Sequence, residues 1–291
     1  MKLRRKPKRK QALAGLTVLL LFAATPLSPA AANDETVILE DASVTINGEE
    51  VLLDDPIRMT DGRLFLPVAP LAGLFGATVE WDGADEAATI HTTTNDKIVM
   101  RNGVPVVRMN EQRYLMDVSP YLADGRTYLP FRFAAELMNA SVEWNEAEKT
   151  AELTSTASTA EELPELRPAD PYTEEDMQLL AKLVQVEAGS ESYEGQLAIA
   201  NIILNRVKDS RFPNTIRDVI YSGRQFPPAH NGLLDRSEPN DSALRATRDA
   251  LDGKNNIEDA VYFYNPDVTG GSFWDRLEVV AEIGNHAYAR Q

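Results

Sequence analysis

A glutamate on the apolar face of one expected helix is the strongest candidate for chemistry in this sequence. The segment Thr173–Gly189 begins like a capping box, because Thr173 precedes Asp176 by three residues, and it ends at a glycine. Glu187 continues a stripe at helical spacing that is formed by Leu179, Leu180, Leu183 and Val184. Burial and the negative end of the helix dipole both disfavour an ionised carboxylate there, so we expect a raised pKa for Glu187. A carboxylic acid that stays protonated near neutral pH can act as the general acid in glycosidic cleavage.

The residues around this helix predict a mainly helical domain. Residues 195–207 are apolar on nearly every side, with Asn201 and Asn205 as the polar exceptions, which is typical of a central buried helix. Other expected elements are helices at 215–221 and 242–251, a strand at 260–266, and a segment at 277–289 whose periodicity fits helix or strand.

The N-terminus has the three-part organisation of a secretory signal peptide. The first ten residues carry seven positive charges, thirteen apolar or small residues follow at 12–24, and Pro, Ser and Ala lead to Ala32. We therefore predict a signal peptide at 1–32 and a secreted, cell-wall-associated protein. The alternative is an uncleaved anchor, for which thirteen residues are short against the ~20 that span a bilayer.

Removal of this segment leaves a strongly acidic chain without cysteine. The formal net charge of −16 becomes −23 when the seven N-terminal positive charges are lost. This charge argues against nucleic acid or, after cleavage, a membrane as a partner. The missing cysteines exclude disulfides and a Cys–His amidase, and three histidines without paired-ligand spacing argue against a zinc peptidase. No Gly-x-Ser-x-Gly or phosphate loop is present, and we expect no cofactor and no metal.

The first half of the chain contains an internal repeat at an offset of 63 residues. Residues 59–90 align without gaps to residues 122–153, and thirteen of the 32 positions are identical. The shared strings are Asp-Gly-Arg, Leu-Pro and Val-Glu-Trp. A turn at Asp-Gly-Arg, a short helix and a strand through the tryptophan predict two ββαββ units, which form one small α+β module at 36–153.

This repeat resembles the copper amine oxidase N-terminal-like module of secreted bacterial proteins, through its paired DGR-x-x-LP and VEW strings. The resemblance implies no metal chemistry here, because the module has one histidine, His91, and no Cys or acidic cage with ligand spacing. Trp81 and Trp144 could stack on sugars, but packing of the sheet on its helix is the preferred interpretation. We predict a binding or spacer unit, followed by a linker at 154–172 rich in Ser, Thr, Pro and Glu.

The second domain, predicted at 173–290, resembles the catalytic domain of the SleB-type cell wall hydrolases, which include the spore-cortex-lytic enzymes. The resemblance rests on the collinear strings LLAKLVQVEAGSESYEGQLAIANIILNRVKDSRFPNTIRDVIYSGRQF, VYFYNP and IGNHAYA. It implies a lysozyme-like fold and peptidoglycan as the substrate, in the vegetative wall or the spore cortex. It also implies that the glutamate of the VEA string, Glu187, is the catalytic acid.

Lytic transglycosylase chemistry, with which the family is associated, suits a site with one essential carboxylate. Glu187 would protonate the oxygen between N-acetylmuramic acid and N-acetylglucosamine, and would then take the proton of the muramic 6-hydroxyl to close a 1,6-anhydro ring. The alternative is a hydrolytic muramidase, which needs a second carboxylate ~5–5.5 Å or ~6.5–9.5 Å away. Candidates for that carboxylate are Glu194, Asp209, Glu278 and Glu282.

An alternative of another class is a non-catalytic wall-binding or surface-layer protein that only grips glycan. Glu187 would then be a partly exposed residue at a helix end, without a chemical role.

Candidate substrate-binding residues are Gln225, Phe226, Tyr262, Tyr264 and Asn265. The first two match the family's Gln-Phe string, although Pro227 stands where a small polar residue is more usual. Aromatic faces and an amide suit glycan and acetamido recognition, but tyrosines in the core and Asn265 in a turn are an equal alternative. His286 resembles a family position, with a structural role preferred, and Trp274 is either a sugar platform or a surface-packing residue.

Overall fold

The computed structural model describes residues 36–51, 53, 55–137, 140–155, 167–169, 172–223 and 225–291. The predicted signal peptide at 1–32 and most of the predicted linker lie outside these residues. In the described part, no helix is long and apolar enough to cross a membrane.

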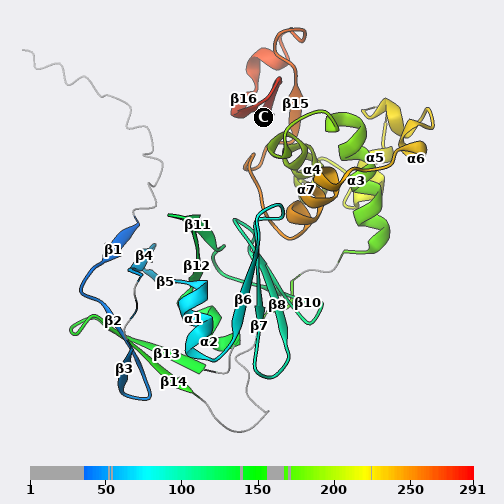
Figure 1. Cartoon of the computed structure of the whole chain (residues 1–291). Coiled ribbons are helices and arrows are strands. Elements are labelled where there is room, and N and C mark those ends of the chain that lie inside the picture. Colours follow the sequence, from blue (N-terminus) through cyan, green and yellow to red (C-terminus); the bar gives the residue numbers. More distant parts are fainter. Residues whose placement is uncertain are drawn as a thin grey trace, which may run out of the picture. The chain divides into compact units, whose positions relative to one another are not determined.

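The N-terminal module is built mainly from β-hairpins and two short helices (Figure 1). Its elements are β1 (Val37–Leu39), β2 (Ser43–Ile46), β3 (Glu49–Val51), β4 (Ile57–Thr60), β5 (Arg63–Pro67), α1 (Val68–Leu74), β6 (Thr78–Asp82), β7 (Ala87–His91), β8 (Lys97–Arg101), β9 (Val106–Met109), β10 (Gln112–Leu115), β11 (Tyr121–Ala123), β12 (Arg126–Pro130), α2 (Phe131–Leu137), β13 (Ala140–Asn145) and β14 (Thr150–Ser155).

The predicted ββαββ units are confirmed, and their equivalent strands pair at the centre of the module. β4, β5, α1, β6 and β7 form the first unit, and β11, β12, α2, β13 and β14 form the second. In each Asp-Gly turn both residues have positive φ, 51° and 70° at Asp61 and Gly62 and 51° and 73° at Asp124 and Gly125, which is the type I′ geometry of tight hairpins. β5 then pairs with β12 in a sheet of order β1-β4-β5-β12-β11.

Two more hairpins, β2–β3 and β9–β10, extend the repeat units into separate sheets. The sheet orders are β13-β14-β2-β3 and β10-β9-β8-β7-β6. Trp144 packs against the module core as expected, but Trp81 is 47 % exposed, so the packing interpretation is wrong for that residue. Trp81 stands on β6, an edge strand with one paired side, where the end of the sheet leaves its ring uncovered.

The second domain is mainly helical, with one small sheet, as the sequence predicts. Its elements are α3 (Glu174–Ala188), α4 (Tyr193–Lys208), α5 (Ile216–Tyr221), the 3-10 helix η1 (Pro227–Ala229), α6 (Leu233–Arg236), α7 (Asp241–Leu251), β15 (Tyr262–Tyr264), the 3-10 helix η2 (Trp274–Arg276), β16 (Glu278–Ile283) and β17 (His286–Arg290).

Helix α4 is the central helix of this domain, and α3 and α7 pack against it (Figure 1). Its two polar exceptions are buried and hydrogen-bonded: the Asn205 amide donates to the carbonyl of Ala260 at 2.8 Å, and Asn201 lies 3.4 Å from the Asn256 side chain. The segment that periodicity left open is a hairpin, because β16 and β17 pair with each other and β17 also pairs with β15.

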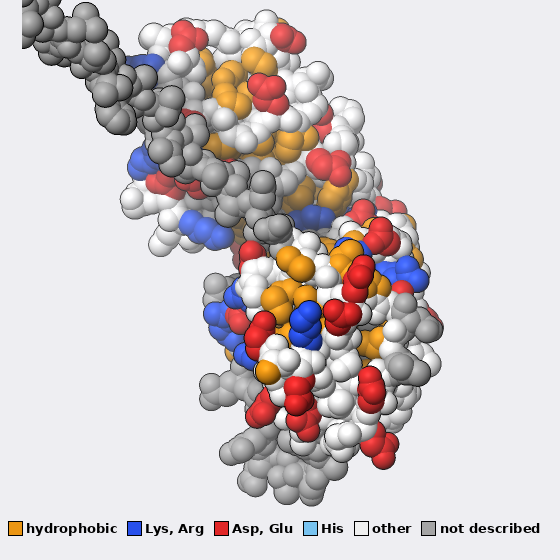
Figure 2. All heavy atoms as spheres, turned by 90° about the vertical axis from the view of Figure 1, so that its left-hand side faces the viewer, with side chains coloured by type: hydrophobic (Ala, Val, Ile, Leu, Met, Phe, Trp, Pro, Cys, Tyr) orange, Lys and Arg blue, Asp and Glu red, His pale blue; other side chains and the backbone are white. Residues whose placement is uncertain are grey.

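The C-terminal part of the predicted linker is attached to the module. Pro168 bridges Tyr114 in antiparallel pairing, and the Leu115 amide donates to the carbonyl of Arg167 at 2.8 Å. Residues 167–169 therefore lie along the free edge of β10 rather than forming a free tether. On the face seen in Figure 2, Asp and Glu side chains are spread among some Lys and Arg side chains.

Candidate active site

Glu187 lies on the last turn of α3, at the margin of the domain core. The helix starts at the predicted capping box, in which Thr173 Oγ1 accepts from the Asp176 amide at 3.0 Å and the Asp176 carboxylate accepts from the Thr173 amide at 3.1 Å. Leu180, Leu183 and Val184 on the same face are fully buried, so α3 is fixed against α4 and α7. The carboxyl group thus projects from a rigid element.

The Glu187 side chain is partly buried and unpaired. Among the residues that the structure describes, no donor or cation hydrogen-bonds to its carboxylate. Burial therefore acts without compensation and raises the pKa of Glu187, as predicted. A carboxyl group in this condition can keep its proton and deliver it to a leaving oxygen.

Glu191 is a second partly buried carboxylate close in sequence, and the sequence interpretation missed it. Its amide donates to the carbonyl of Ala188 at 2.9 Å, so the chain turns back just after α3. Its Oε1 lies 3.7 Å from Nδ1 of His286 on β17. Together with burial, the charge of Glu191 raises the pKa of Tyr288. No sequence signal pointed to Glu191, because it follows the glycine that ends the helical periodicity.

Of the four carboxylates proposed from sequence as hydrolytic partners, Glu194, Glu278 and Glu282 are exposed and Asp209 is partly buried. Two of the four are engaged by arginines. Arg211 holds Asp209 through hydrogen bonds of 2.6 to 3.0 Å and lowers the pKa of Asp209 to about 2. Arg290 holds Glu278 at 2.7 Å and lowers its pKa. Such strongly stabilised anions are poor general bases. The remaining two, Glu194 and Glu282, have exposed side chains.

Five aromatic rings form a continuous strip beside the small sheet. Tyr262 and Tyr264 are two residues apart on β15 and therefore share one face of the strand. The neighbouring ring centroids are 4.8 to 6.4 Å apart in the order Phe212, Tyr262, Phe273, Trp274, Tyr264. Phe273 is 38 % exposed, so this aromatic strip reaches solvent. Strips of this kind can stack on sugar rings.

The other predicted contacts are divided between surface and structural positions. Gln225 is exposed, but Phe226 is 1 % exposed and belongs to the core, so its side chain serves packing and not substrate contact. Asn265 Oδ1 accepts from the Asp267 amide at 2.9 Å, which is the turn alternative. His286 packs edge-on against Phe263 at 5.8 Å, on the other side of β15 from the aromatic strip.

These features define a helical domain with a partly buried carboxyl group of raised pKa and an aromatic strip suited to saccharides. Residues 190–289 match the family described as Cell Wall Hydrolase, and residues 45–153 match the family described as Copper amine oxidase N-terminal domain. The second domain therefore belongs to the cell wall hydrolases, and it follows a copper amine oxidase N-terminal-like domain. Glu187 lies three residues before the matched segment, so its role stays a prediction.

Relatives in curated collections and solved structures match the same part of the chain. A spore cortex-lytic enzyme of Oceanobacillus iheyensis is 40 % identical over 120 residues, which are 41 % of this chain and 43 % of the relative. A spore cortex-lytic enzyme of Bacillus cereus is 38 % identical over 41 % of this chain and 46 % of its own. The chain thus spans less than half the length of these relatives.

The solved structures are catalytic domains. The catalytic domain of the germination-specific lytic transglycosylase SleB from Bacillus anthracis is 34 % identical, with a TM-score of 0.39, over 42 % of this chain and 98 % of that domain. The catalytic domain of Bacillus cereus SleB is 35 % identical, with a TM-score of 0.40, over 42 % of this chain and 94 % of that domain.

Proposed function

We propose that this protein is an exported lytic transglycosylase that cleaves the glycan strands of peptidoglycan. The observation that carries the proposal is the raised pKa of the partly buried Glu187, which has no hydrogen-bond or ion-pair partner among the described residues and lies just before the segment that matches the cell wall hydrolase family. The names of the relatives support the wall or the spore cortex as the site of action. Export rests on the signal peptide predicted at 1–32.

The proposed reaction uses Glu187 twice. Its proton passes to the oxygen between N-acetylmuramic acid and N-acetylglucosamine, and the glycosidic bond breaks with an oxocarbenium-like transition state. The resulting carboxylate then takes the proton of the muramic 6-hydroxyl, whose oxygen closes the 1,6-anhydro ring. Because Glu187 ends as it began, one carboxyl group completes the cycle. Among the described residues no cation pairs with Glu187, which suits this role, since a cation would stabilise the anion and lower the pKa.

The test is digestion of purified peptidoglycan by the full chain and by Glu187→Gln, with mass analysis of the products. We expect anhydromuropeptides from the wild type and almost none from the variant. Equal product yields from both proteins would remove Glu187 from the mechanism. Saccharide binding without any product from the wild type would instead favour the non-catalytic wall-binding class.

Glu191 favours one second candidate, a hydrolytic muramidase in which it acts as the second carboxylate. For the transglycosylase, we expect Glu191→Gln to lower kcat less than about tenfold, because no second carboxylate enters the reaction. The exposed Glu194→Gln is the matched control. A loss of about 10²-fold or more in Glu191→Gln alone, with reducing muramic ends as the wild-type product, would establish hydrolysis instead.

The aromatic strip predicts weaker substrate binding when one of its rings is removed. Trp274 contacts both Phe273 and Tyr264, so Trp274→Ala removes one platform ring and loosens two others. We expect KM for glycan strands to rise about three- to tenfold with a smaller change in kcat, as an aromatic contact of about 0.5–1.5 kcal/mol predicts. Trp81→Ala, an exposed tryptophan of the module, is the comparison, and a larger KM effect there would place the platform on the module.

A further inference from the structure

A buried cluster of ion pairs joins the module to the second domain. Asp252 follows the end of α7 and is fully buried. Three arginines from adjacent strands of the module surround its carboxylate: Arg101 at 2.5 Å, Arg113 at 2.8 Å and Arg108 at 3.1 Å. Arg101 also binds Asp249 on α7 at 2.5 Å. The two domains are therefore held together by specific charged groups of β8, β9 and β10.

One arginine of this cluster, Arg108, is incompletely bonded. Its guanidinium lies 3.1 Å from Asp252 and donates to the Tyr172 hydroxyl at 2.7 Å. The Nε atom of Arg108 is buried and has no hydrogen-bond partner among the described residues. A buried donor of a charged group without a partner is costly, so an anion close to Arg108 would be bound favourably.

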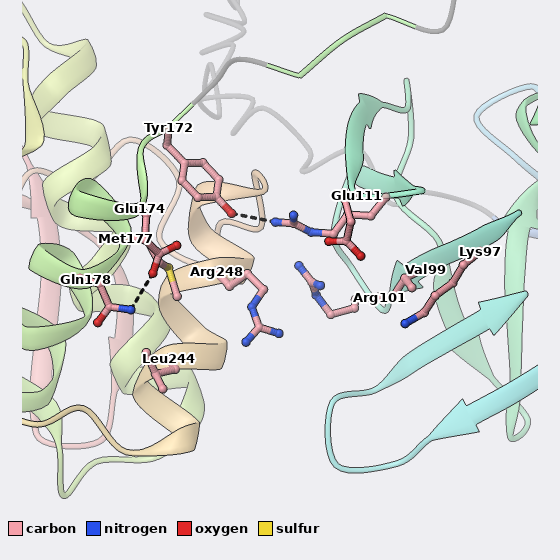
Figure 3. Close-up of a pocket in the computed structure, with 11 residues that line it drawn as sticks. Lys97, Val99, Arg101, Glu111, Tyr172, Glu174, Met177, Gln178, Leu244 and Arg248 are labelled. Carbon is pink, nitrogen blue, oxygen red and sulfur yellow. Dashed lines mark hydrogen bonds between the residues drawn. The ribbon is translucent and has the colours of Figure 1, made fainter.

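Arg108 is one of the residues that line an open cavity of about 480 Å³. Figure 3 shows this cavity. Lys97 and Arg101 extend toward it from β8, and Arg248 extends from α7 on the opposite side. Of these cations, Lys97 and Arg248 are accessible and loosely held, since Arg248 lies 3.9 Å from its nearest carboxylate, that of Asp85. The cavity thus presents cations on a protein whose formal charge is strongly negative.

The cavity also contains acidic groups at its margin. Glu111, Glu174 and Tyr172 line it. The Tyr172 hydroxyl accepts a hydrogen bond from Arg108 at 2.7 Å. Both walls of the cavity therefore carry a cation and a carboxylate. Such a lining suits a ligand that has both a carboxylate and an amino group.

We infer that this cavity between β8 and α7 binds the free carboxylate of a peptide, namely a peptide stem of the peptidoglycan strand. The inference rests on the proposed function, which makes peptidoglycan the glycan strand that carries the stem. Carboxylate oxygens accept from Arg248 and Lys97, while Glu111 or Glu174 accepts from an amino group of the same stem. The module then contributes to substrate recognition and is more than a spacer.

Position and charge favour a peptide stem over a polyphosphate. The cavity meets the first turn of α3, and Glu187 is on its last turn, about 20 Å along the axis. A four-residue stem spans at most ~14 Å, so the occupant belongs to a sugar further along the strand than the one cleaved. A long phosphate polymer would meet the repulsion of the acidic surface, whereas a short stem presents one or two carboxylates to the cavity alone.

Binding of a synthetic stem tetrapeptide to the full chain tests this inference, with Glu187→Gln as the background so that no cleavage is needed. Calorimetry compares this protein with one that also carries Lys97→Ala and Arg248→Ala. We expect Kd to rise at least tenfold, because the variant loses two charged donors that bond to the stem carboxylates. The matched control carries Lys149→Ala and Arg217→Ala, which remove the same charges from exposed sites, and its Kd should change less than twofold.

Two further probes decide what the cavity recognises. The same peptide with amidated carboxylates should bind at least tenfold more weakly, and inorganic phosphate should not compete at equal concentration. Equal affinity of the amidated peptide, equal affinity of both double variants, or effective competition by phosphate would each overturn the assignment. Far-UV circular dichroism confirms that the variants are folded. If the stem binds but the wild type yields no glycan product, the proposed function fails and this inference stands. If the wild type yields glycan product but the stem does not bind, this inference fails and the proposed function stands.

Discussion

Glu187→Gln is expected to lower kcat for glycan cleavage by about 10²–10⁴-fold, the usual contribution of a positioned general acid. Glutamine keeps the size and polarity of the side chain but has no proton to deliver. Because α3 is fixed by its capping box and its buried leucines, the substitution should leave the fold intact and KM nearly unchanged. Steady-state kinetics on soluble glycan strands measure both constants.

The raised pKa of Glu187 gives this prediction a pH dependence. The acid must be protonated, so the rate falls as pH rises through its pKa, and burial moves this limb above the ~4.3 of an ordinary glutamate. Glu187→Gln should show no such limb. A wild-type profile that falls at the ordinary value would contradict the role of burial.

The same pKa predicts how stability responds to pH. A folded-state pKa above the unfolded one adds stability that is fully present below the unfolded pKa and is lost as pH rises through the folded pKa. Glu187→Gln lacks this loss, so its Tm should exceed that of the wild type at pH 8 and approach it at pH 4. We expect the difference to be small, because solvent screens the partly exposed side chain. Differential scanning calorimetry at both pH values measures it.

Features encoded locally could be predicted from the sequence. The capping box of Thr173 and Asp176 depends on residues three apart, and the Asp-Gly turns need nothing beyond their own dihedral angles. The orientation of Glu187 followed from helical spacing for the same reason. The sequence left the segment at 277–289 open between helix and strand, because a strand there depends on pairing with β15.

Features that depend on distant partners could not be predicted. Asp252 looks like an ordinary polar residue after a helix, and its arginine partners are 139 to 151 residues earlier in the chain. Glu191 becomes notable only when β17 brings His286 beside it. Phe226 matched a family string, yet whether an aromatic ring faces substrate or core depends on how its loop folds back.

Asp252→Ala is expected to lower the free energy of unfolding by about 3–5 kcal/mol, the largest stability effect that we expect in this chain. The aspartate itself contributes little net energy, because burying the charges costs about as much as their attraction returns. Its removal is costly since Arg101, Arg108 and Arg113 then lose the buried carboxylate that they share at the junction, and among the described residues Asp249 stays as a partner of Arg101.

Urea unfolding monitored by tryptophan fluorescence measures this effect, because the tryptophans occur in both domains. Asp117→Ala is the matched control: it removes an exposed partner of Arg167 across 3.3 Å and should cost less than about 1 kcal/mol. If the junction is a fixed contact, Asp252→Ala should also separate one unfolding transition into two, because the domains then lose their shared cluster. Equal stability of Asp252→Ala and Asp117→Ala would mean that the arginines find water or other acceptors when the carboxylate is gone, and the cluster would then not hold the domains together.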